Sequence, residues 1–265
     1  MVTMAVGTFD FFSDCLRRNT TFRIILPNEE DVREGSAKEP MKTLILLHGY
    51  CGGCNEWLWY GNAVDMAQKY HLCIVLPTGE NSFYLDGKET GRQYATYIGR
   101  ELLQYVRKTF GLSERREDTF IGGFSMGGFG AIHTALQFAD TFEAAIGLSS
   151  ALIVHGINGM KPGEGNEVAN YDYYKLMFGN LDSLEESNAN PEKLVCELKE
   201  RGEELPRFYL ACGEQDFLLQ PNRDFAAFLQ AYGVDFCYFE GPGEHNFDYW
   251  NKHLEPGIQW ILNKA

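Results

Sequence analysis

Long hydrophobic runs are missing from this sequence of 265 residues, and so is any excess of positive charge. No apolar stretch approaches the roughly 20 residues that a membrane-spanning helix needs, which argues against insertion into a membrane. Lysine and arginine number 23 against 37 aspartates and glutamates, so the formal net charge is -14. A field of this sign repels phosphate backbones. It therefore excludes nucleic acid as a partner and favours a neutral or cationic small molecule.

The sequence also lacks the features of a secretory signal and of a disulfide framework. At the N-terminus, MVTMAVGTFDFFSDCLRR places its basic residues after the apolar ones and has no small-residue cleavage site, so we expect a cytoplasmic protein. Seven cysteines, an odd number, are typical of reduced thiols in a chain of this length. Cys51 and Cys54 form a single C-x-x-C without the second pair that a zinc site requires, and we interpret them as loop thiols.

What is present is an alternation of short apolar runs with longer amphipathic stretches, which is typical of βαβ units. Runs such as LILL and CIVL contain no polar residues, as expected for central parallel strands that are covered on both faces. The pattern predicts a single α/β domain over residues 1–265, in which helices flank a mostly parallel sheet. The predicted strands are residues 22–26, 43–47, 72–76, 119–123, 144–148, 208–212 and 236–239. The predicted helices are residues 62–70, 92–110, 127–138, 220–232 and 250–262.

Two segments depart from this alternation. Residues 28–40, NEEDVREGSAKEP, predict a solvated turn, and we expect it to join the strands at 22–26 and 43–47 into an antiparallel edge. Residues 151–193 are rich in Gly, Pro and Asn, with aromatic residues between them. Because irregular stretches of this length are usually functional, they predict an aromatic, lid-like insert.

The strongest local signal is TFIGGFSMGGFGAIHTAL, which places a G-x-S-x-G motif between a predicted strand and a predicted helix. Glycine is needed on both sides of Ser125 because larger side chains would collide in so tight a turn. The turn exposes the serine hydroxyl above the sheet, at the N-terminus of a helix. A glycine-rich turn with an incidental serine is the structural alternative, and the context favours Ser125 as a nucleophile.

A serine hydroxyl needs a base within hydrogen-bond distance, and that base needs a carboxylate to hold its tautomer. In this architecture the order along the chain is serine, acid, histidine, each on a loop after a strand. His245 in FEGPGEHNFDYW follows the last predicted strand and is our choice of base. His253 falls within the last predicted helix and is the reserve. His133 and His155 precede any plausible acid-bearing strand.

The acid is expected on the loop where RFYLAC continues into GEQDFLLQPN. Asp216 is preferred, although an aspartate just before a helix could also serve only as its cap. Glu214 on the same loop is the fallback. Asp235 and Asp172 rank lower because neither follows a core strand.

A tetrahedral intermediate needs backbone N–H donors aimed at its oxyanion. The residue after the nucleophile, Met126, supplies one. The loop that follows the strand at 43–47 reads HGYCGG, and its small residues let the backbone approach the site. We assign the second donor to the Tyr50 amide on this loop. His48 is interpreted as a strand-end histidine that packs locally.

The segments LLHGYCGG, IVLPTGENSFYLDG, FIGGFSMGGFGA, CGEQDFL and PGEHNFDYW together resemble the esterase D superfamily, in particular its tributyrin-esterase and feruloyl (cinnamoyl) esterase branch. The resemblance covers nearly the whole chain and implies an α/β-hydrolase fold without metal or organic cofactor. It implies hydrolysis of short-chain acyl (acetyl, butyryl) or hydroxycinnamoyl (feruloyl) esters. It places Ser125, Asp216 and His245 on the family's triad positions, and the amides of Tyr50 and Met126 on its oxyanion positions.

S-formylglutathione hydrolases and mycolyltransferases are similar at the serine turn and at PTGENSFYLDG. This sequence departs from them at the loop of Cys51 and Cys54 and in its shorter aromatic insert, which argues against thioester and trehalose-type substrates.

The residues thus predict a serine carboxylesterase that works through an acyl-enzyme. Two alternatives stay open: a thioesterase like the S-formylglutathione hydrolases, and a ligand-binding homologue that has lost catalysis. The expected partner is a small-molecule ester, with acylated sugars and phenolic esters among the options, and a homo-oligomer is compatible with the sequence. Several aromatic side chains are expected either to line the pocket or to pack in the core or lid: Trp57, Trp59, Phe83, Tyr84, Tyr171 and Tyr174.

Overall fold

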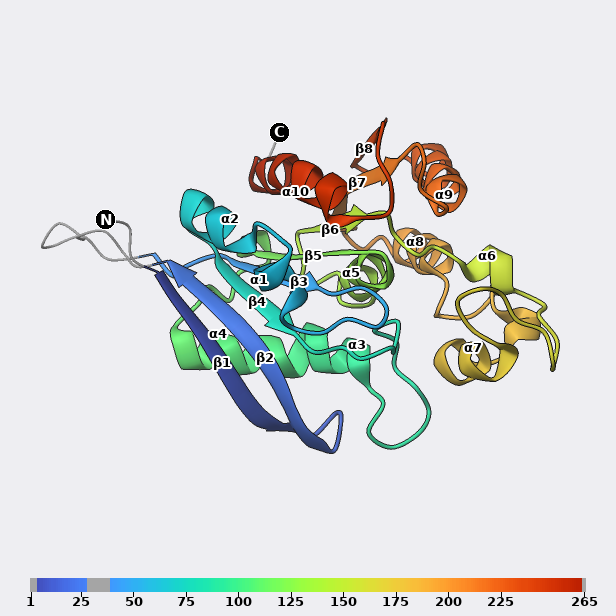
Figure 1. Ribbon diagram of the computed structural model, residues 1–265, viewed down its shortest axis with the longest axis horizontal. Coiled ribbons are helices and arrows are strands. Elements are labelled where there is room, and N and C mark those ends of the chain that lie inside the picture. The colour runs from blue at the N-terminus through green and yellow to red at the C-terminus, as the bar shows by residue number, and fades with distance from the viewer. Residues whose placement is uncertain (1–3, 28–38, 264–265) are drawn as a thin grey trace, which may run out of the picture.

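Within residues 4–27 and 39–263, which the computed structural model describes, eight strands form one sheet in the order β1-β2-β4-β3-β5-β6-β7-β8 (Figure 1). The strands from β3 to β8 run parallel, whereas β1 and β2 join one edge through antiparallel pairings. The bounds are β1 (Met4–Ser13), β2 (Arg18–Pro27), β3 (Thr43–Leu47), β4 (Cys73–Pro77), β5 (Thr119–Phe124), β6 (Ala144–Leu148), β7 (Arg207–Gly213) and β8 (Phe236–Gly241).

The seven predicted strands correspond to β2 through β8, but β1 has no counterpart among them. The predicted antiparallel pairing of residues 22–26 with 43–47 is wrong. β2 pairs instead with β1, where Phe9 lies opposite Phe22, and with β4 on its other side. β3 is occupied on both edges by β4 and β5, which leaves it no edge for β2. Residues 28–38 of the predicted turn lie outside the described residues.

Helices cover both faces of the sheet. Successive side chains of the inner strands point to opposite faces, and on each face they join a separate buried cluster. Ile45 and Ile121 belong to the cluster that includes side chains of α4, α5, α8 and α9, and Leu44 and Phe120 to the cluster that includes α1, α2 and α10. The bounds are α1 (Glu56–Trp59), α2 (Ala63–Tyr70), α3 (Tyr94–Thr96), α4 (Leu103–Phe110), α5 (Met126–Gln137), α8 (Pro191–Glu200), α9 (Leu219–Ala231) and α10 (Phe247–Leu262).

The predicted helix at 92–110 is present as α3 and α4 joined by a π-helical segment, Tyr97–Leu102. The other four predicted helices correspond to α2, α5, α9 and α10. In the described parts of the chain, no helix is long and apolar enough to cross a membrane.

Residues 151–193 are more regular than the sequence suggests. They contain α6 (Val154–Ile157), α7 (Tyr171–Phe178), a 3-10 turn at Leu181–Ser183 and the start of α8. α6 and α7 lie together at one end of the molecule, beyond the carboxyl end of β6 (Figure 1). Asn170 caps α7 by accepting the Tyr173 amide, and Asn190 caps α8 by accepting the Glu192 amide. Asn170 and Asn190, which suggest loop in the sequence, are therefore helix caps.

Candidate active site

The carboxyl ends of four parallel strands bring the predicted site residues to one edge of the sheet. Tyr50 follows β3, Ser125 follows β5, Asp216 follows β7, and His245 lies between β8 and α10. Since β3 pairs with β5 and β7 pairs with β8, loops that are far apart in the sequence meet here.

Ser125 occupies a strained turn between β5 and α5. Its backbone has φ 54° and ψ −121°, a conformation that non-glycine residues rarely adopt. The flanking glycines make the turn possible: a Cβ on Gly123 would lie 2.4 Å from the Gly127 carbonyl oxygen, and one on Gly127 would lie 2.6 Å from the carbonyl oxygens of Leu47 and His48. The G-x-S-x-G motif is thus explained by close backbone packing of β5, α5 and the end of β3.

We expect Gly127→Ala to destabilise the fold, because the new methyl group meets two rigid backbone carbonyls rather than mobile side chains. Overpacking of this kind costs about 3 kcal/mol, which lowers the Tm of a chain of this length by about 6–12 °C. Gly156→Ala in α6 is the matched control, since nothing lies within 4 Å of its Cβ position. Thermal unfolding followed by circular dichroism compares the two variants. Equal Tm values would contradict the packing argument.

Ser125, His245 and Asp216 form a continuous chain of contacts. Ser125 Oγ lies 3.0 Å from His245 Nε2, and His245 Nδ1 lies 2.9 Å from Asp216 Oδ2. A carboxylate only accepts, so Nδ1–H donates to Asp216 and leaves Nε2 free to accept the Ser125 hydroxyl proton. This is the arrangement that a general base needs to activate a serine hydroxyl.

The surroundings hold Asp216 as a carboxylate. Its side chain is fully buried, whereas the His245 side chain is 21% exposed. Burial alone would raise the pKa of this carboxyl. Hydrogen bonds from His245, from the Ser149 hydroxyl and from the Leu218 amide outweigh burial and lower the pKa of Asp216 below its usual value. The Leu218 amide donates to Oδ1 at 2.8 Å. Asp216 therefore accepts through both oxygens.

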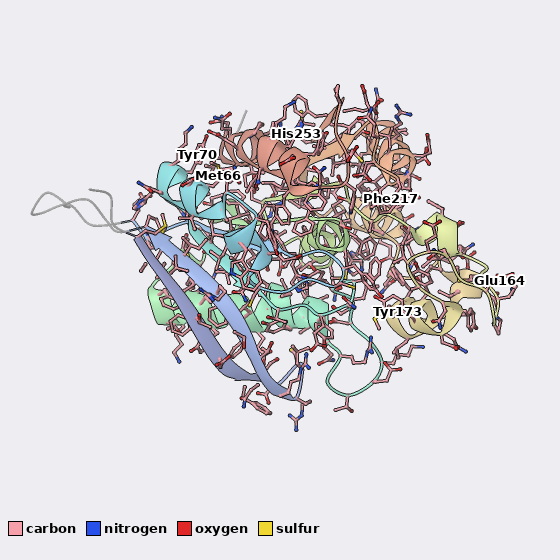
Figure 2. The ribbon with its side chains drawn as sticks, in the orientation of Figure 1. Met66, Tyr70, Glu164, Tyr173, Phe217 and His253 are labelled. Carbon is pink, nitrogen blue, oxygen red and sulfur yellow. The ribbon has the colours of Figure 1, made fainter. Side chains whose placement is uncertain are left out.

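The reserve candidates lie in other surroundings. His253 lies on α10 (Figure 2). Its ring stacks on Tyr249 at 4.3 Å and lies 6.4 Å from the ring of Phe239. Burial of its ring lowers the pKa of His253. Glu214 is exposed on the Asp216 loop, and the structure brings Asp216, not Glu214, to His245.

The other histidines make structural contacts. His133, buried in α5, contacts the Asn188 carbonyl oxygen through Nε2, and exposed His155 lies between Glu185 and Glu192. His48 is buried, with Nδ1 against the Gly49 carbonyl oxygen and Nε2 accepting the Gly79 amide. These contacts fit its interpretation as a locally packed histidine.

The amides of Tyr50 and Met126 are the predicted oxyanion donors. Both residues line the same cavity as Ser125, and neither amide donates to a partner among the described residues. The neighbouring Cys51 amide, in contrast, donates to Asn81 Oδ1 at 2.7 Å. Two free N–H groups beside a serine hydroxyl are what an oxyanion site requires.

A cavity of about 760 Å³ opens beside Ser125 and His245. This volume is ordinary for a small-molecule site. Glu56 and Glu167 are the charged residues among those that line it, and none of the described lining residues is a lysine or an arginine. Its aromatic lining consists of Tyr50, Tyr60, Phe83, Phe124, Tyr174, Phe217, Phe247 and Trp250.

Of the six predicted pocket residues, Phe83 and Tyr174 line this cavity and the other four do not. Trp57 is buried in the core, where its Nε1 donates to the Leu47 carbonyl oxygen. Trp59 is 69% exposed. The Tyr84 hydroxyl donates to the His48 carbonyl oxygen and so holds the end of β3. Tyr171 is half-buried on α7.

Four of the unpredicted aromatic residues that line the cavity lie close to the triad residues in the sequence. Phe124 precedes Ser125, Phe217 follows Asp216, and Phe247 and Trp250 follow His245. Phe217, which is labelled in Figure 2, is 68% exposed. Its ring lies 4.7 Å from that of His245. Adjacency to the predicted triad is a signal that could have found them.

Cys51 and Cys54 are free thiols, the first exposed and the second buried. Cys51 Sγ lies 3.9 Å from Asn81 Nδ2. Among the described residues, no three His, Cys, Asp or Glu side chains are grouped so as to hold a metal ion.

Comparison with known proteins identifies the family of this chain. Residues 13–261 match the model of the Esterase family, described as "Putative esterase". The chain belongs to this family. An acetyl esterase of Caldicellulosiruptor saccharolyticus is 40% identical to this esterase over 261 residues, which are 97% of this chain and 98% of the relative. The esterase is accordingly a carboxylic-ester hydrolase, as predicted.

Solved structures agree with this assignment. FphF, a fluorophosphonate-binding serine hydrolase of Staphylococcus aureus, shares 29% identity with a TM-score of 0.87, over 98% of this chain and 99% of that one. The S-formylglutathione hydrolase FrmB of the same organism shares 29% identity with a TM-score of 0.85, over 98% of this chain and 100% of its own. The predicted α/β-hydrolase fold and the resemblance to the esterase D superfamily are confirmed for this esterase.

Proposed function

We propose that this esterase hydrolyses short-chain acyl esters of neutral alcohols, acetyl esters in particular, through an acyl-enzyme on Ser125. The continuous contact from Ser125 Oγ through His245 to Asp216 is the observation that carries the proposal. Ser125 attacks the carbonyl carbon while His245 takes the hydroxyl proton and passes it to the leaving alcohol. A water molecule, deprotonated by His245, then attacks the acyl-enzyme and releases the acid.

The oxyanion that forms at each step is stabilised by the amides of Tyr50 and Met126. Both amides lack another partner among the described residues, so they give up no hydrogen bond to receive it. The Met126 amide also lies at the N-terminus of α5, whose dipole favours negative charge.

The charge of the cavity supports a neutral substrate over a glutathione thioester. A glutathione thioester carries two carboxylates and one ammonium group, so its net charge is negative and its carboxylates need cationic partners when they leave water. Glu56 and Glu167 line the cavity, none of the described lining residues is cationic, and the chain carries a net charge of -14. An uncharged acyl ester meets no such repulsion. The 40% sequence identity with an acetyl esterase supports the acetyl group as the preferred acyl group of the substrate.

We assign residues 151–193 to a lid-like insert on this single domain. Asn166 and Val168 lie in the segment before α7 and line the cavity. Asn166 Oδ1 accepts the amides of Val168 and Ala169 and the hydroxyl of Tyr174, so the segment is fastened to α7. Through these contacts the insert closes one side of the cavity.

Initial rates on a panel of acetyl, butyryl, octanoyl and feruloyl esters test the substrate. We expect kcat/KM to be highest for the acetyl and butyryl esters. Each acyl donor is measured with the same alcohol, so that the leaving group does not vary. A preference for the feruloyl ester would move the assignment to hydroxycinnamoyl substrates.

Two further measurements separate the alternatives. Parallel kinetics on an acetyl ester and on S-formylglutathione test the thioesterase, and we expect the oxygen ester to be the better substrate. A fluorophosphonate probe tests the binding homologue, because it forms a bond only with an activated serine. We expect stoichiometric labelling of Ser125, and a folded protein without any label would support the catalytically inactive homologue.

A further inference from the structure

Ser149, the residue after β6, combines complete burial with an unusual backbone. It is 0% exposed and has φ 46°, in the left-handed region that favours glycine. Its amide donates to the Ala211 carbonyl oxygen of β7 at 2.7 Å. A non-glycine residue persists in such a conformation only where its surroundings hold it, and strain of this kind concentrates at functional sites.

The Ser149 hydroxyl connects α10 to the candidate acid. Trp250 Nε1 donates to Ser149 Oγ at 3.0 Å. Because the indole N–H can only donate, the acceptor side of the hydroxyl is used and its proton is available for another group. Asp216 and the Cys212 thiol both lie within the influence of this hydroxyl, whose single proton can go to only one of them at a time, and the hydroxyl lowers the pKa of the Asp216 carboxyl.

Trp250 also contacts the candidate base. Its ring lies 5.0 Å from that of His245, at an interplanar angle of 90°, and it stacks on Phe124 at 4.1 Å. Three contacts thus connect Ser149 to Trp250, Trp250 to His245, and His245 to Asp216. The effect of the Ser149 hydroxyl on the pKa of Asp216 completes a closed cycle. Three separate elements meet in this cycle: the end of β6, the loop after β7 and the start of α10.

We propose that Ser149 and Trp250 are positioning residues for the Asp216–His245 pair. Ser149 gives the carboxylate a donor beyond His245 and Leu218, which restricts its rotation. Trp250 orients the Ser149 hydroxyl through its indole N–H, and its ring restricts the movement of the His245 imidazole. The inference rests on the proposed roles of Ser125, His245 and Asp216. Its physical basis is that a general base must stay within hydrogen-bond distance and correct orientation.

Ser149→Gly is the first test, because it removes the hydroxyl while glycine accepts the positive φ without strain. We expect kcat to fall by about 10- to 100-fold, as for the loss of a hydrogen bond to a charged group. KM should stay within about twofold, since Ser149 is not among the residues that line the cavity. Expressing kcat per site labelled by the fluorophosphonate probe removes any contribution from misfolded protein.

Trp250→Phe is the second test and keeps an aromatic ring while removing the N–H donor. We expect a smaller loss of kcat than in Ser149→Gly. Trp260→Phe is its matched control on the same helix, because Trp260 packs on Arg207 and Tyr209, outside the cycle. The control should keep wild-type kcat. The Ser149→Gly/Trp250→Phe double variant should lose less than the product of the two single losses, since both act on one network.

Wild-type kcat per labelled site in both Ser149→Gly and Trp250→Phe would overturn the inference, as would equal losses in Trp250→Phe and Trp260→Phe. If Ser149→Gly does not fold, Trp250→Phe with its control decides. Ser125→Ala separates this failure from that of the proposed function. An inactive Ser125→Ala beside a fully active Ser149→Gly rejects only the positioning role, whereas an active Ser125→Ala rejects the nucleophile itself.

Discussion

Ser125→Ala is expected to lower kcat by about four to six powers of ten, because the other members of a triad contribute little without the nucleophile. The Ser125 hydroxyl contacts His245 Nε2, and the backbone of the turn is held by main-chain bonds: its amide donates to the Leu148 carbonyl oxygen, and its own carbonyl accepts the Ala151 amide. These bonds remain in the alanine variant. We therefore expect Tm to stay close to that of the wild type, and the fluorophosphonate label to disappear.

Ser150→Ala is the matched control for this experiment. Ser150 is also a buried serine at the same edge of the sheet, but its Oγ has no hydrogen-bond partner among the described residues. Its loss should leave kcat unchanged. Esterase activity in Ser125→Ala at the wild-type level, measured after complete removal of contaminating esterases, would refute the nucleophile assignment.

The parts of this site that the sequence predicts are those where chemistry and chain position coincide. Ser125, Asp216 and His245 each follow a short apolar strand, and parallel strands bring their carboxyl ends to one edge. Position distinguishes the histidines: His48 also follows a strand, but only His245 follows the last strand, after the loop that carries the acid. The structure brings these three side chains together, and their catalytic roles stay predictions for the experiments above.

The side-chain directions within loops are not predictable in this way. Phe83 and Tyr84 are neighbours in PTGENSFYLDG, and both have positive φ, at 52° and 55°. Phe83 lines the cavity, whereas Tyr84 points behind it to the backbone of His48. No periodic pattern distinguishes the two residues in the sequence, because the direction of each is set by an irregular backbone.

The missed elements have a similar cause. β1 is recognisable as a strand only beside β2, since its exposed edge and half-buried side chains give a weak pattern. α8 has a helix start signal in Asn190-Pro191-Glu192, but it lies at the end of a segment rich in loop residues. Ser149 gives no signal at all: the letters GLSSAL do not reveal that one hydroxyl faces Trp250 and Asp216.

Asp216→Asn should lower kcat by about four powers of ten while leaving the fold intact. The asparagine side chain presents an N–H group where the carboxylate accepts from His245 Nδ1–H. The imidazole then favours the tautomer that protonates Nε2, which cannot accept the Ser125 proton. Asp224→Asn on the exposed side of α9 is the control and should keep wild-type kcat. Equal activity in the two variants would reject Asp216 as the orienting acid.

The wild type and Asp216→Asn also give a pH test of stability. Because the pKa of Asp216 is lower in the folded chain than its ordinary value of about 3.9, ionised Asp216 stabilises the fold above that pH. This contribution is lost as the pH falls through the folded-state pKa, since the carboxylate then takes up a proton in both states. The asparagine of the variant has no such proton to bind. We therefore expect the Tm of the wild type, relative to that of Asp216→Asn, to fall as the pH is lowered from about 6 to about 3. A difference that stays constant over this range would mean that His245, Ser149 and Leu218 do not hold the carboxylate in its ionised form, and the closed cycle around it would lose its electrostatic basis.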